Sequence, residues 1–211
     1  MWSHDTKGFL VTVDGPNGSG KSTLIASIRQ KLENAGYDVY TTREPTDTEL
    51  GRFVRSFAEN HFGISLACMV AADRYEHILK EIVPELEKGV LVIVDRYILS
   101  SLILQEMDGV SHTYVMELNS EIIRPDLQVA VFADESVLQK RLADRATLTR
   151  FERGSQSDKE LKYMEEGIAE LEKQSISVLR ISNNNDIEAN TYKIINYIIS
   201  EWRKHEKISS N

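Results

Sequence analysis

The fold of this chain is decided by one stretch near its start, Val11-Thr12-Val13-Asp14-Gly15-Pro16-Asn17-Gly18-Ser19-Gly20-Lys21-Ser22-Thr23. An apolar run ends at Val13, a glycine-rich loop follows, and Lys21 and Ser22 open a segment with helical periodicity. The spacing between Gly15 and Gly20-Lys21-Ser22 is that of a phosphate-binding P-loop. A strand, this loop and a helix in succession predict a nucleotide-binding protein.

The loop contains the residue types that polyphosphate binding requires. Glycines let successive backbone N–H groups turn toward phosphate oxygens, and the start of the next helix adds free N–H donors and a positive dipole end. Lys21 supplies a positive charge to the β and γ phosphates, and the Ser22 hydroxyl can bind Mg²⁺. The alternative is a glycine-rich turn without a ligand. We expect ATP to contact Gly15, Pro16, Asn17, Gly18, Ser19, Gly20, Lys21, Ser22 and Thr23.

The composition indicates one globular domain over residues 1–211. Of the 211 residues, 41% are hydrophobic and 27% are charged, which is ordinary for a soluble protein. The formal net charge is −8 and no block of lysine and arginine stands out, which argues against nucleic acid or an anionic membrane as the main partner. An anionic small substrate stays possible, because a local arginine cluster can oppose the global charge.

Cysteine content and hydropathy suggest where the protein works. The single cysteine, Cys68, excludes an intrachain disulfide, and its apolar neighbours predict a buried, inert thiol. No apolar run approaches the length of a membrane span, and the polar first residues lack a secretory pattern. We therefore expect a cytoplasmic protein.

Short β-branched runs alternate with longer helical patterns along the chain. Strands are expected at residues 9–13, 38–42, 90–94, 127–132 and 177–181. Helices are expected at about 21–35, 48–60, 64–88, 98–107, 112–123, 135–143, 158–174 and 186–205. Such alternation predicts an α/β fold of the P-loop NTPase type, with about five parallel strands between two layers of helices. Gly36 and Gly89 follow helix ends as left-handed caps do, and Pro84 is expected to kink or divide the helix that contains it.

A charged triplet, Asp95-Arg96-Tyr97, follows the predicted strand at 90–94. A carboxylate at the end of a buried strand near the P-loop can hold Mg²⁺ or its waters, so Ser22 and Asp95 are the predicted metal residues. Arg96 would point into the same crevice and could clamp a phosphate with two N–H groups. The alternative is a pair of strand-end residues that cap the next helix.

Further arginines follow the other strands. Thr42-Arg43-Glu44-Pro45 comes after the second predicted strand, and Arg55 falls on the next helix. Arg74 lies in an apolar helix and needs an anionic partner, for which Asp73 is the candidate. A parallel sheet brings Arg43, Arg55, Arg74 and Arg96 to one edge. The cluster of Arg43, Arg55 and Arg96 favours a substrate that already carries phosphate.

The segment of about 141–156 is rich in arginine and glycine-tipped in an otherwise acidic chain. It can be a solvated helix end and loop, or a lid that closes over a nucleotide, and the P-loop favours the lid. The P-loop itself contains no arginine. If the transferring phosphoryl group needs a guanidinium, Arg145 or Arg150 of the lid is the available source, and we place Arg141 at the ATP site.

Several motifs beyond the P-loop occur in a familiar order and spacing. They are Thr42-Arg43-Glu44-Pro45, Ala71-Ala72-Asp73-Arg74 with His77, Asp95-Arg96-Tyr97 with Ser100, Ser101 and Gln105, Pro125-Asp126-Leu127, and Arg150-Phe151-Glu152. Their register holds from about residue 8 to residue 175, and a looser similarity runs to the end. The chain in this respect resembles the bacterial thymidylate kinases, a family of nucleoside-monophosphate kinases.

The resemblance implies transfer of the γ-phosphoryl group of ATP to dTMP with Mg²⁺, usually by a homodimer. It implies that Arg43, Arg55 and Arg96 hold the acceptor phosphate and that Arg74 contacts the base edge. By the same comparison, Ser101 and Gln105 line the base site, and Asp14 and Glu44 lie near sugar and phosphate. The expected catalytic set is therefore Lys21, Arg96, Asp14, Arg150 and Arg145.

The chain departs from this family at three positions. Val70 stands where the family has a phenylalanine that stacks on thymine, Leu104 where it has a tyrosine against the sugar, and Ile168 where a tyrosine is usual. One hypothesis is a base pocket altered for a modified or different pyrimidine nucleotide. The other is an ordinary thymidylate kinase that repacks the site with aliphatic side chains.

Two other functions fit parts of the pattern. A deoxynucleoside kinase would need a carboxylate base near the acceptor hydroxyl, and Glu44 could serve, but the arginine cluster favours a phosphorylated acceptor. A non-catalytic nucleotide-binding switch would bind ATP without turnover that depends on an acceptor. The acceptor arginines and the lid argue against that switch.

Overall fold

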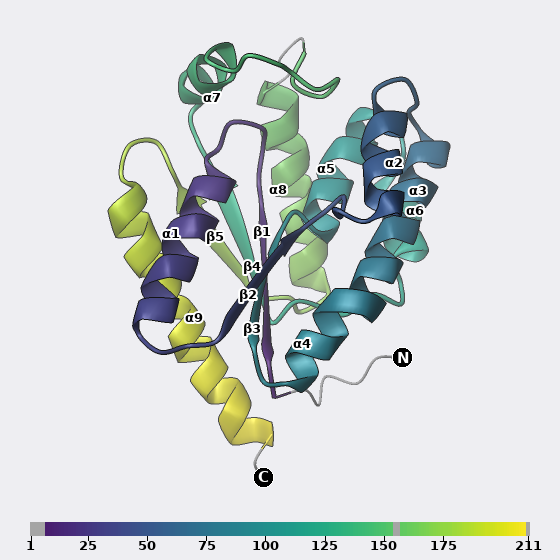
Figure 1. The fold of residues 1–211 in the computed structure, drawn as a ribbon. Helices are drawn as coiled ribbons and strands as arrows, with labels where there is room; N and C mark the ends of the chain where they lie inside the picture. Colours follow the sequence, from purple (N-terminus) through teal and green to yellow (C-terminus); the bar gives the residue numbers. More distant parts are fainter. Residues whose placement is uncertain (1–6, 154–156, 210–211) are drawn as a thin grey trace.

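The computed structural model describes residues 7–153 and 157–209, and it contains a parallel β-sheet between helices (Figure 1). The strand order is β2-β3-β1-β4-β5, and the pairings are parallel, as predicted. The strands are β1 (Phe9–Asp14), β2 (Val39–Arg43), β3 (Leu91–Asp95), β4 (Leu127–Phe132) and β5 (Val178–Ser182). Each begins and ends within one residue of its predicted range.

The register of the sheet places the predicted functional residues along one edge. Arg43 at the end of β2 is paired with Asp95 at the end of β3, and Asp95 is paired with Val13 of β1. Because all these strands are parallel, their carboxyl ends open on the same side of the sheet, where the P-loop leaves β1.

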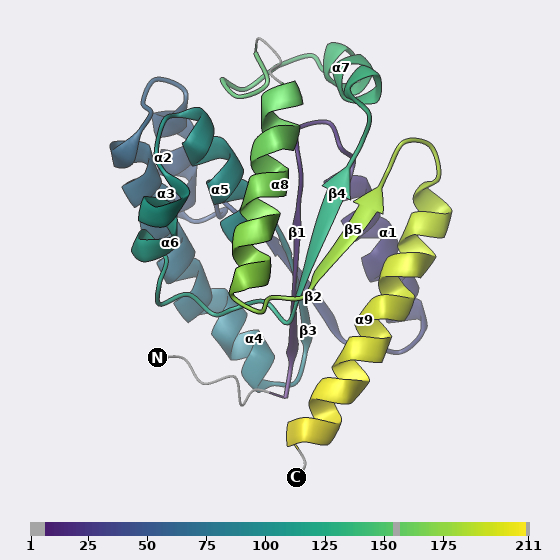
Figure 2. The same cartoon turned by 180° about the vertical axis from the view of Figure 1, so that it is seen from behind.

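Two helices cover one face of the sheet, namely α1 (Lys21–Asn34) and α9 (Ile187–Ser209). Figure 2 shows α9 and α1 together beside β4 and β5. Leu24 and Ile28 of α1 and Ile194 of α9 are buried against the β1 side chains on this face. In globular proteins, packing of an apolar face in this way stabilises a helix more than its intrinsic helix propensity does.

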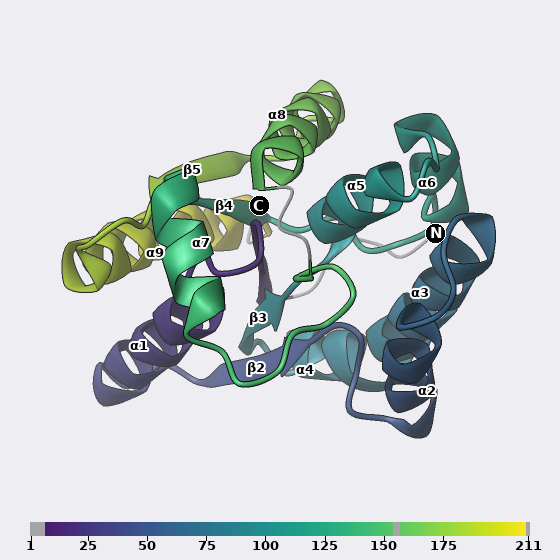
Figure 3. The same cartoon turned by 90° about the horizontal axis from the view of Figure 1, so that it is seen from above.

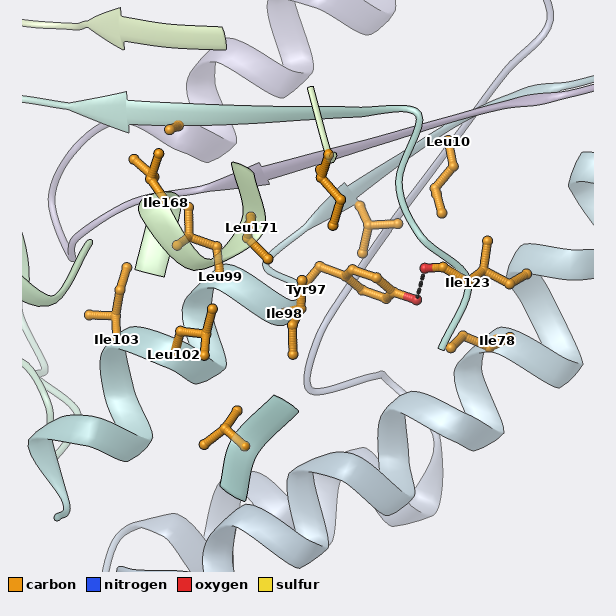
Figure 4. Packing of buried hydrophobic residues seen from close by; sticks show 14 of the residues in the cluster. Leu10, Ile78, Tyr97, Ile98, Leu99, Leu102, Ile103, Ile123, Ile168 and Leu171 are labelled. Carbon is orange, nitrogen blue, oxygen red and sulfur yellow. Dashed lines mark hydrogen bonds between the residues drawn. The ribbon is translucent and has the colours of Figure 1, made fainter. Parts of the chain in front are cut away.

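The other face carries the helices that shape the site. They are α2 (Glu49–Ala58), α3 (Ile64–His77), α4 (Val83–Glu87), α5 (Ile98–Met107), α6 (His112–Leu118) and α8 (Ser157–Lys173). Figure 4 shows the centre of this core, where the Tyr97 ring lies among aliphatic side chains and its hydroxyl donates to the Ile123 carbonyl oxygen at 3.0 Å. Ile168 of α8 is fully buried in the same cluster.

The helix predicted at 64–88 is divided, as the position of Pro84 suggested. An α-helix ends at His77, a π-helical turn follows over Ile78–Ile82, and α4 begins with Pro84 in its first turn. Proline is tolerated there because the first N–H groups of a helix have no partner inside the helix. The predicted left-handed glycines are also confirmed, since φ is 86° at Gly36 and 82° at Gly89.

One prediction about the surface is wrong. Cys68 is exposed, whereas its apolar neighbours suggested a buried thiol. The reason is helical geometry: Ala67 and Ala71 point into the core, and Cys68 is turned about 100° away from Ala67. The Cys68 sulfur lies 4.0 Å from the Tyr114 hydroxyl.

The predicted lid follows α7 (Glu135–Ala143) and runs as a loop to residue 153. Residues 154–156 of the predicted lid lie outside the described residues. Viewed from above, the loop crosses from α7 toward α2 and α3, over the carboxyl ends of the strands (Figure 3). In the described part of the chain, no helix is long and apolar enough to cross a membrane.

Candidate active site

The P-loop lies between β1 and α1 and is held by close backbone packing. Gly20 has φ of 89°, a left-handed conformation that favours glycine. A Cβ atom on Gly15 would lie 2.2 Å from the Val131 carbonyl oxygen, so no larger residue fits there without a shift. Asn183 also supports the loop, because its Nδ2 donates to the Ser19 carbonyl oxygen at 2.8 Å.

Lys21 is folded into its own loop. Its Nζ lies 2.9 Å from the carbonyl oxygens of both Gly15 and Pro16, and the side chain is buried. Burial, with a further contribution from the positive charge of Arg96, lowers the pKa of Lys21 to about 7. An incoming phosphate would favour the charged ammonium form.

The predicted metal residues are brought together. The Ser22 hydroxyl donates to Asp95 Oδ2 at 2.8 Å, and the other oxygen of that carboxylate, Asp95 Oδ1, is buried without a hydrogen-bond partner. Among the described residues, no cluster of three or more His, Cys, Asp or Glu side chains could hold a metal. A hydroxyl and a single carboxylate suit Mg²⁺, which takes the rest of its ligands from water and phosphates.

A cavity of about 450 Å³ opens beside the P-loop at the carboxyl edge of the sheet. Its charged and polar lining includes all four predicted arginines, and its apolar lining comes from α2, α3, α5 and the lid. The predicted residues that line it are Asn17, Ser22, Arg43, Glu44, Arg55, Val70, Arg74, Asp95, Arg96, Ser101, Leu104, Gln105 and Arg145.

Arg96 connects the P-loop with this cavity. One guanidinium nitrogen donates to Asn17 Oδ1 at 2.7 Å, and the other lies 3.3 Å from the Ser100 hydroxyl. The backbone of Arg96 has φ of 72°, an uncommon conformation for a residue other than glycine. Such conformations concentrate at functional sites, where the surrounding structure must hold them.

Asp47, which the sequence analysis did not single out, sets the geometry of the two outer arginines. Its carboxylate lies 2.6 Å from Arg43 and 2.8 Å from Arg55. Arg55 also donates to the Pro45 carbonyl oxygen. The hydrogen bond from Arg43 lowers the pKa of Asp47. Both arginines line the cavity, whereas Asp47 does not.

Arg74 has a different partner from the one expected. Its Nε donates to Glu44 Oε2 at 2.8 Å, and its other nitrogens donate to Asn119 Oδ1 and the Ser101 hydroxyl, each at 2.8 Å. Asp73 instead accepts hydrogen bonds from the amide and hydroxyl of Thr46. The expected Asp73–Arg74 pair is therefore wrong, because adjacent helix residues point in different directions.

Of the three positions at which the chain departs from the family pattern, two line the cavity. Val70 and Leu104 line the cavity, close to the buried Gln105, whose Oε1 has no hydrogen-bond partner. Ile168 does not line it, because this side chain is fully buried against α5 in the core. The altered positions in the cavity are therefore two, and the expectation that Ile168 belongs to the same pocket is wrong.

Asp14 is also placed differently from the prediction. It is fully buried and does not line the cavity. Its carboxylate accepts hydrogen bonds from the amides of Tyr97 and Ser100 at 2.8 and 2.9 Å, and from the Gln128 side chain at 3.0 Å. Asp14 thus fixes the turn that carries Arg96 and acts on the cavity only through that turn.

The two lid arginines, Arg145 and Arg150, contact different partners. Arg145 pairs with Glu152 and lines the cavity together with Glu152. Arg150 makes two hydrogen bonds of 2.8 Å to Asp108 and one of 2.7 Å to the Ala58 carbonyl oxygen, and it does not line the cavity. The structure therefore places Arg145, but not Arg150, in the lining of the cavity.

Arg141 lies against the P-loop, as predicted. It donates to the carbonyl oxygens of Gly18 at 3.2 Å, Asn183 at 3.0 Å and Asn184 at 2.9 Å. These contacts join α7 to the loop after β5. Arg141 does not line the cavity.

Sequence reasoning missed Glu160, a buried carboxylate on α8. Its Oε2 accepts a hydrogen bond from the backbone N–H of Asn17 in the P-loop at 2.9 Å. Burial raises the pKa of Glu160, and the charges of Arg96 and Lys21 partly oppose that rise. A polar residue on the core side of an amphipathic helix was the only available sign of this contact.

Comparison with known proteins agrees with this geometry. The sequence model of the thymidylate kinase family matches residues 13–194. A probable thymidylate kinase of Pyrococcus horikoshii is 31% identical over 199 residues, covering 90% of this chain and 97% of its own. A probable thymidylate kinase of Pyrococcus abyssi is 37% identical over 155 residues, which cover 70% of this chain and 76% of its own. A thymidylate kinase of Caldicellulosiruptor saccharolyticus is 40% identical over 144 residues, which cover 64% of this chain and 70% of its own.

Solved structures give the same fold. The crystal structure of thymidylate kinase from Ehrlichia chaffeensis matches 91% of this chain and 98% of its own, with a TM-score of 0.68 and 23% identity. We compared the motifs of the chain with those of bacterial thymidylate kinases. The relatives named above include archaeal proteins, so the similarity extends to the family as a whole and is not limited to its bacterial members. The chain belongs to the thymidylate kinase family, the nucleoside-monophosphate kinases that use ATP to convert dTMP to dTDP.

Proposed function

We propose that the enzyme binds ATP along the P-loop and the acceptor monophosphate in the 450 Å³ cavity, with Arg96 at the boundary. The observation that carries this assignment is the contact of Arg96 with Asn17. One guanidinium thereby touches the P-loop while lining the acceptor cavity. A group in that position can stabilise negative charge as it passes from one phosphate to the other.

Catalysis in this arrangement consists of positioning and charge stabilisation. The acceptor phosphate is already ionised at neutral pH, so the reaction needs no strong general base. Arg43, Arg55 and Arg96 would orient that phosphate toward the γ-phosphoryl group, and Lys21 would hold the donor phosphates. Ser22 and Asp95 would hold Mg²⁺, which neutralises charge on the phosphate oxygens when it is bound.

Arg145 is our candidate for the lid arginine that approaches the transferring group. It lines the cavity, and its carboxylate partner Glu152 comes from the same lid. Arg150 is instead assigned to holding the lid against α2 and α5, through Ala58 and Asp108. The guanidinium that the P-loop lacks would then come from a segment that also excludes water.

The base pocket supports either of the two hypotheses about the acceptor. With Val70 and Leu104 at its wall, the cavity has aliphatic side chains where the family has aromatic ones. Loss of an aromatic stack weakens binding by about 0.5 to 1.5 kcal/mol. We propose a pyrimidine pocket with more room beside the ring, which accepts dTMP and favours a bulkier or modified pyrimidine monophosphate.

We also propose that two copies of the chain form a homodimer through α2 and α3 in the cytoplasm. Exposed apolar side chains gather there, with Phe53 53% exposed, Phe62 69% and Ile64 57%. Apolar patches of this kind mark interaction surfaces. Size-exclusion chromatography with light scattering tests this, since Ile64→Asp is expected to give a monomer and a monomeric wild type would contradict the proposal.

A coupled assay of ADP release tests the proposed reaction. The purified enzyme with ATP and Mg²⁺ is offered each common nucleoside monophosphate, thymidine and 5-substituted pyrimidine monophosphates. Turnover that requires a pyrimidine monophosphate supports the proposal. Turnover with thymidine instead would favour a deoxynucleoside kinase, which the pairing of Glu44 with Arg74 already argues against. ATP binding without any turnover would favour a regulatory switch.

A further inference from the structure

The carboxylate of Glu160 accepts a hydrogen bond from a backbone N–H group of the P-loop. Its Oε2 lies 2.9 Å from the Asn17 nitrogen, and the side chain reaches there from α8, far away in the sequence. Glu160 is only 4% exposed, so this is an internal contact and not a surface one. A carboxylate and a phosphate oxygen are alike as acceptors for such an N–H group.

The positively charged side chains that act on Glu160 are the same ones that we proposed to bind the nucleotide phosphates. Arg96 and Lys21 are the positive groups whose charges act on Glu160, and the same two residues are placed at the junction of donor and acceptor. Asn17 links the two sets, since its amide donates to Glu160 and its side-chain oxygen accepts from Arg96. The carboxylate therefore lies where negative charge from the substrates must accumulate.

We propose that Glu160 competes with nucleotide phosphate for the Asn17 amide and thereby weakens nucleotide binding and speeds release of ADP. This inference rests on the proposed placement of ATP along the P-loop. The physical basis is that two anions cannot share one N–H donor and one pair of cations without repulsion. When phosphate takes the amide, the carboxylate must move off or take up a proton.

The alternative is a purely structural role. A buried backbone N–H group needs an acceptor, and Glu160 would then satisfy the Asn17 amide permanently. The negative charge of Glu160 matters in the competing role but is not needed in the structural one. A structural acceptor can be an uncharged oxygen, whereas a competitor for phosphate acts through its charge.

Glu160→Gln separates these roles, because glutamine keeps an acceptor oxygen in the same place and removes the charge. We expect ADP to bind at least about tenfold more tightly to this variant in calorimetry, since the negative charge of a buried carboxylate repels the phosphates of the nucleotide. The gain is expected in a slower ADP dissociation rate in stopped flow. Unchanged or weaker ADP binding by the folded variant would overturn the proposal.

Glu166→Gln is the matched control. It makes the same chemical change on the same helix, where the Glu166 side chain is 46% exposed and lies 3.6 Å from Lys162. Its ADP affinity is expected to equal that of the wild type, and a gain like that of Glu160→Gln would overturn the proposal. If the wild type binds no ADP, the proposed function itself fails. If the wild type binds ADP and Glu160→Gln binds it equally well, only the proposal about Glu160 fails.

A second measurement uses the unmodified sequence and does not depend on a variant that folds. In the wild type, the ¹³C resonance of the Glu160 carboxyl group and the ¹H–¹⁵N resonance of Asn17 are both expected to shift when ADP is added. A shift of Asn17 together with Glu160 shows that the carboxylate has lost its partner. A Glu160 resonance that does not move at saturating ADP would overturn the proposal.

Discussion

Arg74 and Glu44 form an ion pair that is almost completely shielded from solvent. Their Nε and Oε2 atoms are 2.8 Å apart, and the two side chains are 2% and 3% exposed. The Nδ1 atom of His77 lies 3.2 Å from the other carboxylate oxygen, Glu44 Oε1. Asn119 and Ser101 accept hydrogen bonds from Arg74. Glu44, Arg74 and Ser101 of this network line the cavity.

Removal of one partner of this pair is expected to be costly. Glu44→Gln leaves the Arg74 charge buried without its counter-ion, and such changes destabilise proteins by about 3 to 5 kcal/mol. Urea denaturation measures the free energy of unfolding. Glu166→Gln, an exposed change of the same kind, is expected to alter it by less than about 0.5 kcal/mol. Equal changes in the free energy of unfolding for the two substitutions would show that the buried ion pair matters no more for stability than an exposed glutamate does.

Arg96→Ala is expected to lower turnover by a factor of about one thousand while ATP binding persists, because the guanidinium acts on charge in the transition state. Steady-state kinetics and calorimetry with ATP measure the two effects separately. Arg180→Ala is the matched control, since Arg180 lies on β5 and its side chain is 43% exposed. Near-normal turnover of Arg96→Ala would refute the role assigned to this residue.

Val70→Phe is expected to restore an aromatic surface to the base pocket. A stacking contact of about 0.5 to 1.5 kcal/mol corresponds to a two- to tenfold lower KM for dTMP. The same variant is expected to lose activity with bulky 5-substituted monophosphates, since phenylalanine fills the space beside the ring. Leu79→Phe, on an exposed position of the π-helical turn, serves as the control. If the dTMP parameters do not change, the idea of an altered pocket is wrong.

Nucleotide binding is expected to take up protons near pH 8. The pKa of Lys21 is lowered to about 7 by burial, so the free enzyme carries this amine mostly uncharged at pH 8. Phosphate at Nζ favours the ammonium form and raises the pKa, so that binding draws a proton from the buffer. Calorimetry of ADP binding in buffers of different ionisation enthalpy measures the uptake. Lys21→Arg, whose side chain stays charged, is expected to show none.

The contacts of Arg150 predict how the lid is held. Asp108→Ala removes the two 2.8 Å hydrogen bonds that join the lid to the end of α5. Limited proteolysis is expected to cut the loop of residues 144–153 faster in this variant, because local opening becomes easier. Asp38→Ala, a change outside the lid and cavity, is the comparison. Equal cleavage rates would mean that the Asp108 contact does not hold the lid.

The sheet and the P-loop could be predicted because each depends on a local pattern. Val11 and Val13 lie in an apolar run that only a covered strand explains, and the glycine spacing after them fixes the loop. The arginines of the cavity were predictable for a related reason. Arg43 and Arg96 follow strands directly, and parallel strands end at one edge.

Residues placed by the packing of helices were not predictable in the same way. Cys68 and Ile168 lie on helices, where a rotation of about 100° per residue decides between solvent, cavity and core. The partner of Arg74 is Glu44, from a distant loop, and Glu160 reaches the P-loop from another helix. Such contacts depend on how helices pack across the sheet, which the local periodicity does not contain.

The central claim is that two phosphorylated nucleotides meet between the P-loop and the arginines of the cavity. The most direct test is the affinity, measured by calorimetry, of a bisubstrate compound in which adenosine and thymidine are joined through their 5′ positions by five phosphates. Linked ligands gain from effective concentration, so we expect binding at least about a hundredfold tighter than that of ADP or dTMP alone, with most of the gain lost in Arg96→Ala. Affinity no better than that of ADP, equal in the wild type and in Arg96→Ala, would contradict the claim.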